Sequence, residues 1–398
     1  TAVLPHLGLY SGGVLASLYG LLAAFMYAAT AFLKLDASYA FIGAAAGLLI
    51  NFLISPFLLD LSLRWFQSMK WIEPEELPRH LRDFLQKACQ EHGMPLPRLG
   101  IIEDGNPNAF TYGHSPSNAR LIVTRGLLKM LEPAELEGVI GHELGHALHW
   151  DMLIMTLAAL VPTLLYAIYK VCMKSRGSSS DNKGNPLPMI GLVALILYFV
   201  TEYVVLFLSR VRELHADRFA GNLTKNPNGL ASALVKIAYG LAGRRDPTEE
   251  EAKAGRIEIS ASRTLGIFDP VSALGLVASS AGSGGSLSRE NILGAMQWDL
   301  WNPWAAFYEL RSTHPLPARR IDHLGRQAAQ LGQEPLVRFD LEKPESYWDE
   351  FFVDLAFLWL PWLFGGAVLA AGAAGLPVGS LWPWAAAAWS AGYIGRLM

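Results

Sequence analysis

The sequence predicts a mainly α-helical membrane protein, in which a bundle of about six spans carries a globular α+β part with a small sheet. Two observations support this fold class. Of the 398 residues, 52% are hydrophobic and 17% are charged, and the mean hydropathy is +0.27, which exceeds the usual value for a soluble domain. The apolar residues are also gathered in long blocks, separated by segments of ordinary globular composition.

Six apolar blocks have about the 20 residues that a helix needs to cross a hydrocarbon layer of about 30 Å. They are residues 9–33, 38–59, 152–169, 189–208, 355–373 and 378–395. Five of them contain no Asp, Glu, Lys or Arg, and the fourth contains only Glu202. A transporter would need a polar pathway through the spans, and one acidic residue is weak evidence for such a pathway. We therefore expect three transmembrane hairpins, formed by residues 1–60, 152–209 and 351–398.

Two globular segments, residues 61–151 and 210–350, lie between these hairpins. Neither is expected to bury a complete core alone, so we expect them to fold together across the second hairpin. In the first segment, residues 99–102, 108–112 and 120–123 are predicted to form short strands of a small sheet, and Thr124 is expected to cap a short helix that reaches Leu131. The sheet edge could bind an extended peptide by strand addition, or the sheet could only support the next helix.

The motif His142-Glu143-Leu144-Gly145-His146 lies in a run with the apolar spacing of an amphipathic helix. Residues i and i+4 are neighbours on a helix, so both imidazoles can reach one metal ion while Glu143 projects beside it. This pattern is typical of a zinc hydrolase, and a chance match is the weaker interpretation. Gly141 and Gly145 each weaken the helix by about 1 kcal/mol, which suggests the close approach of another backbone or a ligand.

A third metal ligand is expected on a second helix, where Glu213 and Asp217 share one face. We predict that Glu213 binds the metal and that Asp217 accepts the outward N–H of His142. The alternative is a solvated charged helix in which Arg212 and Arg218 pair with these carboxylates. Both ligand helices can be direct extensions of the third and fourth spans, which would place the metal within about 10 Å of the membrane surface.

These motifs, with two others, carry a resemblance to a known family. The residues are Asn108-Ala109-Phe110, residues 141–146 with Asp151, residues 212–217, and Ser312-Thr313-His314-Pro315 with Arg320-Ile321. Together they resemble the HtpX-type membrane zinc metallopeptidases, which are relatives of the CAAX prenyl endopeptidases. The resemblance covers about residues 60–325 and keeps the family's order of motifs.

The resemblance implies a gluzincin-like peptidase domain with one Zn²⁺ per chain and Glu143 as the catalytic base. The implied zinc ligands are His142, His146 and Glu213. The resemblance also implies that His314 lies near the site and stabilises the oxyanion, and that Asn108, Ala109 and Phe110 belong to a substrate-binding strand. The expected activity is hydrolysis of peptide bonds in membrane or misfolded proteins, with Glu143 activating the water that zinc polarises.

Two alternative functions are kept. HtpX-type proteins typically have four spans and the prenyl endopeptidases have more, so a CAAX-type prenyl-protein endopeptidase is the first alternative. The second is a non-catalytic membrane scaffold in which zinc only joins the two globular segments. Glu143 argues against the scaffold, because a structural zinc site has no use for a base.

The expected location is a multi-pass integral membrane protein with its active site on the cytoplasmic face. Basic residues flank the spans on the globular side, but four others lie in the loop after residue 169, so the positive-inside rule does not fix the orientation of the spans. The cytoplasmic placement of the active site rests partly on the family resemblance. The expected partners are a protein or peptide substrate and the lipid bilayer. A net charge of −3 does not indicate binding to nucleic acid. The sequence does not predict an oligomeric state.

Overall fold

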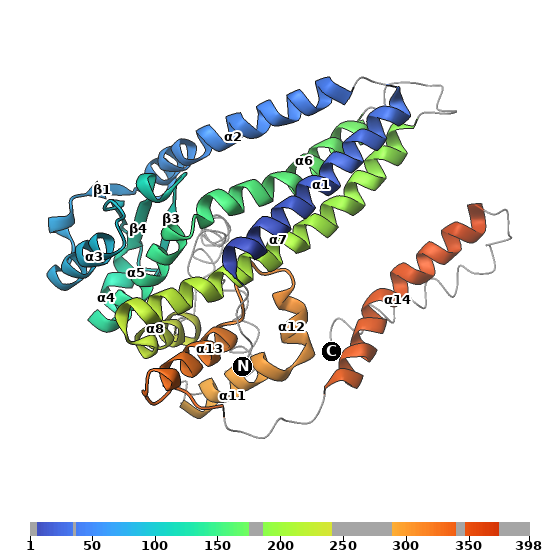
Figure 1. Cartoon of the computed structure of the whole chain (residues 1–398). Helices are drawn as coiled ribbons and strands as arrows, with labels where there is room; N and C mark the ends of the chain where they lie inside the picture. Colours follow the sequence, from blue (N-terminus) through green and yellow to red (C-terminus); the bar gives the residue numbers. More distant parts are fainter. Residues whose placement is uncertain (1–5, 35–36, 175–185, 241–288, 340–346, 374–398) are drawn as a thin grey trace. The chain divides into compact units, whose positions relative to one another are not determined.

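The computed structural model describes residues 6–34, 37–174, 186–240, 289–339 and 347–373 (Figure 1). The chain divides into two compact units. The larger contains Thr1–Gln297 and Tyr308–Phe339, and the smaller contains Trp298–Phe307 and Asp340–Met398. The described residues are mainly helical with one four-stranded sheet, which confirms the predicted fold class.

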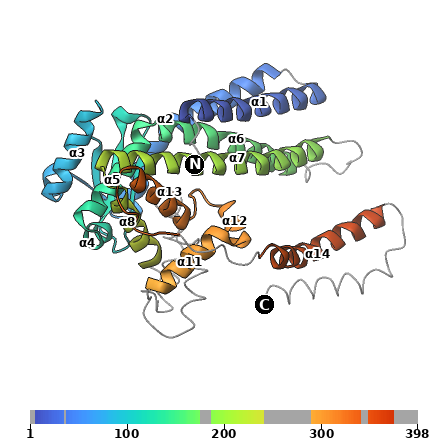
Figure 2. The same ribbon diagram turned by 60° about the horizontal axis from the view of Figure 1, so that its bottom comes forward.

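Three described helices of the larger unit are long and apolar enough to cross a membrane. They are α1 (Leu7–Leu33), α6 (Asp151–Lys174) and α7 (Leu187–Thr224). They contain the first, third and fourth predicted spans and lie side by side in both views (Figure 1, Figure 2). Leu22 and Phe25 of α1 pack with Leu165 of α6 and Ala194 of α7 in one buried cluster.

The other predicted spans have different outcomes. The second block lies in α2 (Ala37–Phe66), and the fifth lies in α14 (Trp348–Ala373), which belongs to the smaller unit. The sixth block lies outside the described residues. Helix α2 runs past residue 60 and α7 runs past residue 209, so helices rather than loops lead out of these apolar blocks.

The sheet has the order β1-β2-β4-β3, with β2 and β4 parallel and the other neighbours antiparallel. Its strands are β1 (Lys70–Ile72), β2 (Arg98–Ile102), β3 (Ala109–Tyr112) and β4 (Arg120–Thr124). The three predicted strands are confirmed, whereas β1 was not predicted, because three residues are too few for an alternating pattern. Thr124 caps α4 (Arg125–Met130), since its Oγ1 accepts the N–H of Leu127 at 3.3 Å.

Helix α5 carries the histidine motif and packs against β3, α3, α7 and α8. The remaining elements are η1 (Pro74–Glu76), α3 (Arg79–Glu91), η2 (Pro116–Asn118), α5 (Pro133–Leu148), α8 (Pro227–Gly240), α11 (Arg289–Trp301), α12 (Pro303–Glu309) and α13 (Pro317–Gln330). A Cβ added to Gly141 would lie 3.4 Å from Ala220 Cα, and one added to Gly145 would lie 3.2 Å from Ala216 Cα. The predicted close approach of another backbone is confirmed, and it brings α7 against the histidine helix.

Candidate metal centre

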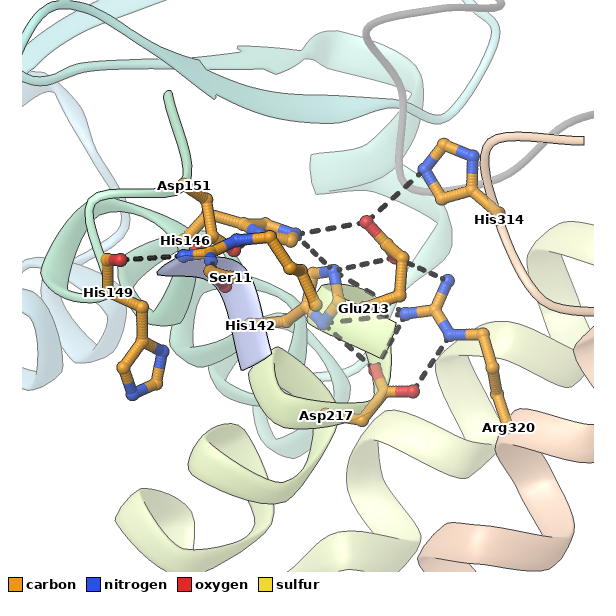
Figure 3. Close-up of polar contacts among 10 residues, drawn as sticks. Ser11, His142, His146, His149, Asp151, Glu213, Asp217, His314 and Arg320 are labelled. Atoms are coloured by element: carbon orange, nitrogen blue, oxygen red, sulfur yellow. Dashed lines mark hydrogen bonds and ion pairs between the residues drawn. The ribbon is translucent and has the colours of Figure 1, made fainter. Parts of the chain in front are cut away.

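Three side chains from α5 and α7 converge on one point (Figure 3). The Nε2 atoms of His142 and His146 are 3.0 Å apart. Glu213 faces both rings, with Oε2 at 3.5 Å from His142 Nε2 and Oε1 at 3.3 Å from His146 Nε2. Each residue offers one ligand atom, and these atoms all lie within 4.8 Å of one another.

This geometry fits a tetrahedral metal ion. Bonds of about 2.0–2.1 Å to nitrogen and oxygen place neighbouring ligand atoms about 3.3 Å apart, close to the separations in this site. Glu213 Oε2 is also buried with no hydrogen-bond partner among the described residues, although a carboxylate oxygen normally finds one. Within the described ranges, no other His, Cys, Asp and Glu group has metal-ligand spacing.

Each histidine is oriented by a second carboxylate. His142 Nδ1 lies 2.9 Å from Asp217 Oδ1, and His146 Nδ1 lies 2.7 Å from Asp151 Oδ2. A carboxylate partner keeps the proton on Nδ1, which leaves the lone pair of Nε2 free for a metal. Asp217 lies beside His142 as the sequence predicts, while its orienting role stays a prediction, and Asp151 makes an equivalent contact with His146 that the sequence did not predict.

Asp151 reaches His146 because the chain turns sharply between α5 and α6. Trp150 has a φ of 59°, in the left-handed region that a large side chain rarely adopts. The expectation that both ligand helices are direct extensions of spans is thus wrong for α5, which ends at Leu148. It is correct for Glu213, which lies on the continuous helix α7.

Arg320 holds the carboxylate that orients His142. It is 1% exposed, and its Nε and Nη2 donate to the two oxygens of Asp217 at 2.9 and 2.7 Å. Its Nη1 also lies 3.4 Å from Glu213 Oε2. Arg320 therefore balances the negative charge that Asp217 and Glu213 bring into the interior.

Arg212 holds the other orienting carboxylate. It is also 1% exposed and pairs with Asp151, while its two terminal nitrogens donate to Ser11 Oγ and to the carbonyl oxygen of His149, both at 2.6 Å. The alternative interpretation of residues 212–217 as a solvated charged face is wrong, because Arg212, Glu213 and Asp217 are all buried.

The surrounding charges change the proton affinity of the histidines. Burial lowers the pKa of His142, but its hydrogen bonds to Asp217 and Glu213 outweigh burial and raise it above the ordinary value. Burial likewise lowers the pKa of His146, but the negative charge of Glu213, a hydrogen bond to Glu213 and the negative charge of Glu143 together raise it above the ordinary value. Because imidazole binds a metal only when neutral, protons compete with a metal for both rings.

The two predicted catalytic side chains lie beside this cluster. Glu143 is 3% exposed, and its negative charge contributes to the raised pKa of His146. His314 lies just before α13, and its Nε2 is 3.6 Å from Glu213 Oε1. Burial lowers the pKa of His314 despite the opposing effect of Glu213. The structure brings both residues to the site, while their catalytic roles stay predictions.

Asn108, Ala109 and Phe110 lie at the start of β3, at one edge of the sheet and against α5. The N–H of Thr124 donates to Asn108 O at 3.0 Å, so in this antiparallel pairing Ala109 and Thr111 direct their peptide groups toward the outer edge. No other strand pairs with that edge among the described residues. The side chains of Ala109 and Phe110 are buried, so backbone groups form this edge.

The sequence is similar to those of known peptidases. The model of peptidase family M48 matches residues 75–328. A protein named Protease HtpX homolog from Methanothermobacter thermautotrophicus is 35% identical over 56% of this chain and 83% of its own length. Protease HtpX homolog 1 from Streptomyces coelicolor is 32% identical over 66% of this chain and 75% of its own length.

One solved structure is also similar, the crystal structure of S. mikatae Ste24p. It aligns with a TM-score of 0.42 and 15% identity over 81% of this chain and 66% of that chain.

Proposed function

Because the chain belongs to peptidase family M48, we propose that it is an integral-membrane endopeptidase that uses one zinc ion to hydrolyse peptide bonds of membrane or misfolded proteins. The family makes the protein a metallopeptidase, and the three apolar helices make it a membrane protein. The identity of the metal, the substrates and the cytoplasmic placement are our proposal. The observation that carries it is the set of His142, His146 and Glu213, with the spacing of a tetrahedral site and one carboxylate oxygen left without a hydrogen-bond partner among the described residues.

The residues around the metal position have distinct roles. A bound zinc ion supplies Lewis acidity, which lowers the pKa of water to about 7 and polarises a peptide carbonyl. Glu143 takes the proton from the attacking water and later gives it to the leaving amine. Asp217 and Asp151 keep the two imidazoles in the orientation and tautomer that this chemistry needs.

His314 stabilises the oxyanion in this proposal. Its Nδ1 lies 2.9 Å from Thr313 Oγ1, and a hydroxyl that donates to Nδ1 leaves the ring proton on Nε2, which faces Glu213. The lowered pKa of His314 keeps the ring neutral near pH 7. A neutral ring that donates from Nε2 can hydrogen-bond the developing negative charge without first losing a proton.

The substrate binds along the outer edge of β3. An extended peptide added there gains main-chain hydrogen bonds from Ala109 and Thr111, with little selection among side chains. Such binding suits unfolded segments of many sequences. The position of Glu213 supports a site near the membrane, because it follows the apolar part of α7 by five residues, which a helix spans in about 7.5 Å.

The proposal is tested with the purified full chain and an unfolded protein substrate. We expect cleavage that a chelator stops and added zinc restores. Glu143→Gln should lower the rate by about 10²–10⁴-fold while the zinc content stays unchanged, because the base is lost and the ligands are not. Leu144→Ile, at the neighbouring buried position, serves as the matched control and should keep most activity.

Other outcomes would contradict the proposal. Full activity of Glu143→Gln would remove the proposed base. Cleavage of a prenylated peptide but of no unfolded protein would indicate the CAAX-type alternative. A zinc-loaded wild type without any cleavage would indicate a scaffold.

A further inference from the structure

A second polar site lies outside the metal centre, at the start of α1. A cavity of about 490 Å³ is bounded there by α1, by the turn after α5 and by α7. Its basic lining residues are His6, His149, Arg212, His215 and Arg218. No acidic side chain is among the described residues that line it. A cavity of this size, with two arginines and no carboxylate among its described lining residues, suits a small anionic ligand.

Arg212 provides independent evidence that a ligand binds in this cavity. Its terminal nitrogens are used by Ser11, Asp151 and the carbonyl of His149. Its Nε, however, is buried without a hydrogen-bond partner among the described residues, in a side chain that is 1% exposed. His149 Nδ1 is buried in the same unpartnered state. Both residues line the cavity, and each has one buried nitrogen without a hydrogen-bond partner among the described residues, which indicates that a partner is missing.

The nearest carboxylate does not neutralise the cavity. Asp151 pairs with Arg212, so these two charges offset each other, and the positive charge that remains on the cavity lining comes from Arg218. Arg218 is exposed and extends the positive charge to the mouth of the cavity. The first N–H groups of α1 add to this charge, because the N-cap His6 makes no capping hydrogen bond with its side chain.

The cavity lies at the height where the apolar surface of the helices ends. On α7, large exposed apolar side chains run from Met189 to Phe207, and the basic residues follow at once. On α1, Leu9 is 77% exposed, only two residues beyond the start of the helix. Tyr10 and Phe207 contact each other edge to face, so these two boundaries coincide. Phospholipid headgroups occupy this layer of a bilayer.

We propose that this cavity binds the phosphate group of an anionic phospholipid headgroup. The phosphate accepts hydrogen bonds from Arg212 and His149 and pairs with Arg218 at the mouth. The acyl chains follow the exposed apolar side chains of α1 and α7. Basic pockets between transmembrane helices are a recognised form of lipid site, and phosphate is the headgroup element that both a guanidinium and a helix N-terminus favour. This site does not depend on the proposed peptidase activity.

The test measures lipid binding to the full chain purified in a neutral detergent. Short-chain phosphatidylglycerol, short-chain phosphatidylcholine and inorganic phosphate are titrated separately, and the rise in Tm gives an apparent affinity for each. We expect phosphatidylglycerol to raise Tm far more than either other ligand. Arg218→Gln should weaken the phosphatidylglycerol affinity about fivefold, the effect of one basic residue at a membrane surface. Arg79→Gln removes the same charge from the exposed start of α3 and should leave the affinity unchanged.

Each other result overturns part of the proposal. Equal effects of phosphatidylcholine and phosphatidylglycerol would exclude recognition of the anion. An equal effect of inorganic phosphate would exclude the lipid as the source of the phosphate. If Arg218→Gln and Arg79→Gln weaken binding to the same extent, the cavity is not the site. His149→Gln provides a second variant within the cavity, and an unchanged affinity in both cavity variants would also exclude the site.

Discussion

The two halves of α7 show how one helix meets two environments. In residues 187–208 most large apolar side chains point outward, while the buried positions include the small residues Gly191, Ala194 and Thr201 beside Ile190, Val205 and Leu208. In the following residues the pattern reverses, and Arg212, Glu213 and Asp217 are buried. Lipid tails are as apolar as leucine, so burying a large apolar side chain of the first half inside the protein gains no hydrophobic free energy over exposing it to lipid. The second half must bury charge to build a metal site.

This difference predicts which kind of substitution each half tolerates. In the polar half, each buried charge is balanced by a specific partner, so the loss of one charge leaves another uncompensated. In the apolar half, small residues let helices approach, so added volume is the damaging change. Loss of a buried charge should therefore destabilise the protein more than added volume does.

Arg320→Ala should have the largest effect on stability. It removes the partner of Asp217 and Glu213 from a site that is 1% exposed, and breaking a buried charge pair costs about 3–5 kcal/mol. Arg326→Ala is the control, because its ion pair with Asp322 lies on an exposed helix face and contributes about 0.5 kcal/mol. Thermal unfolding in detergent measures both variants, and similar Tm values would contradict the role given to Arg320.

Asp217→Asn should weaken the metal site without removing a ligand. The amide keeps the shape of the side chain but no longer offers His142 Nδ1 a negative acceptor, and the loss of such a partner lowers metal affinity about 10–100-fold. Asp322→Asn makes the same change on α13, away from the metal centre. Competition with a chromogenic zinc chelator measures the affinity. Equal affinities of the two variants would mean that Asp217 does not orient the histidine.

Ala194→Val should have the smallest of these effects, and it tests the apolar half. Ala194 is 0% exposed in the cluster of α1, α6 and α7, so two added methyl groups should cost about 1 kcal/mol, at the lower end of overpacking. Leu192→Val changes a neighbouring side chain that is 55% exposed and should stay within about 0.5 kcal/mol of wild type. If Leu192→Val is the more destabilising variant, the face assigned to lipid is wrong.

The sequence predicted the parts of the site that depend on local periodicity. The spacing of His142 and His146 follows from one helical turn, and so does the shared face of Glu213 and Asp217. Gly141 and Gly145 correctly predicted a close helix contact, because glycine in a helix interior needs a packing reason. The same reasoning located three strands of the sheet, since each of them has four or five residues.

The supporting network could not be predicted in this way. Asp151 reaches His146 only because Trp150 turns the chain with a positive φ, for which the sequence offers no glycine or asparagine as a signal. Arg320 comes from α13, more than 100 positions after Asp217, and its pairing depends on tertiary packing. A signal was nevertheless present, because Arg320 belongs to a family motif and had no other role.

The metal content of Glu213→Ala tests the central claim most directly, because Glu213 is the metal ligand that the second globular segment supplies in the site of the described residues. Elemental analysis of the purified full chain should find about one zinc per chain in the wild type and far less in Glu213→Ala. Glu309→Ala removes another buried glutamate, which pairs with Arg319 and not with the metal ligands, and it should keep its zinc. An undiminished zinc content in Glu213→Ala would show that α5 and α7 do not share a metal.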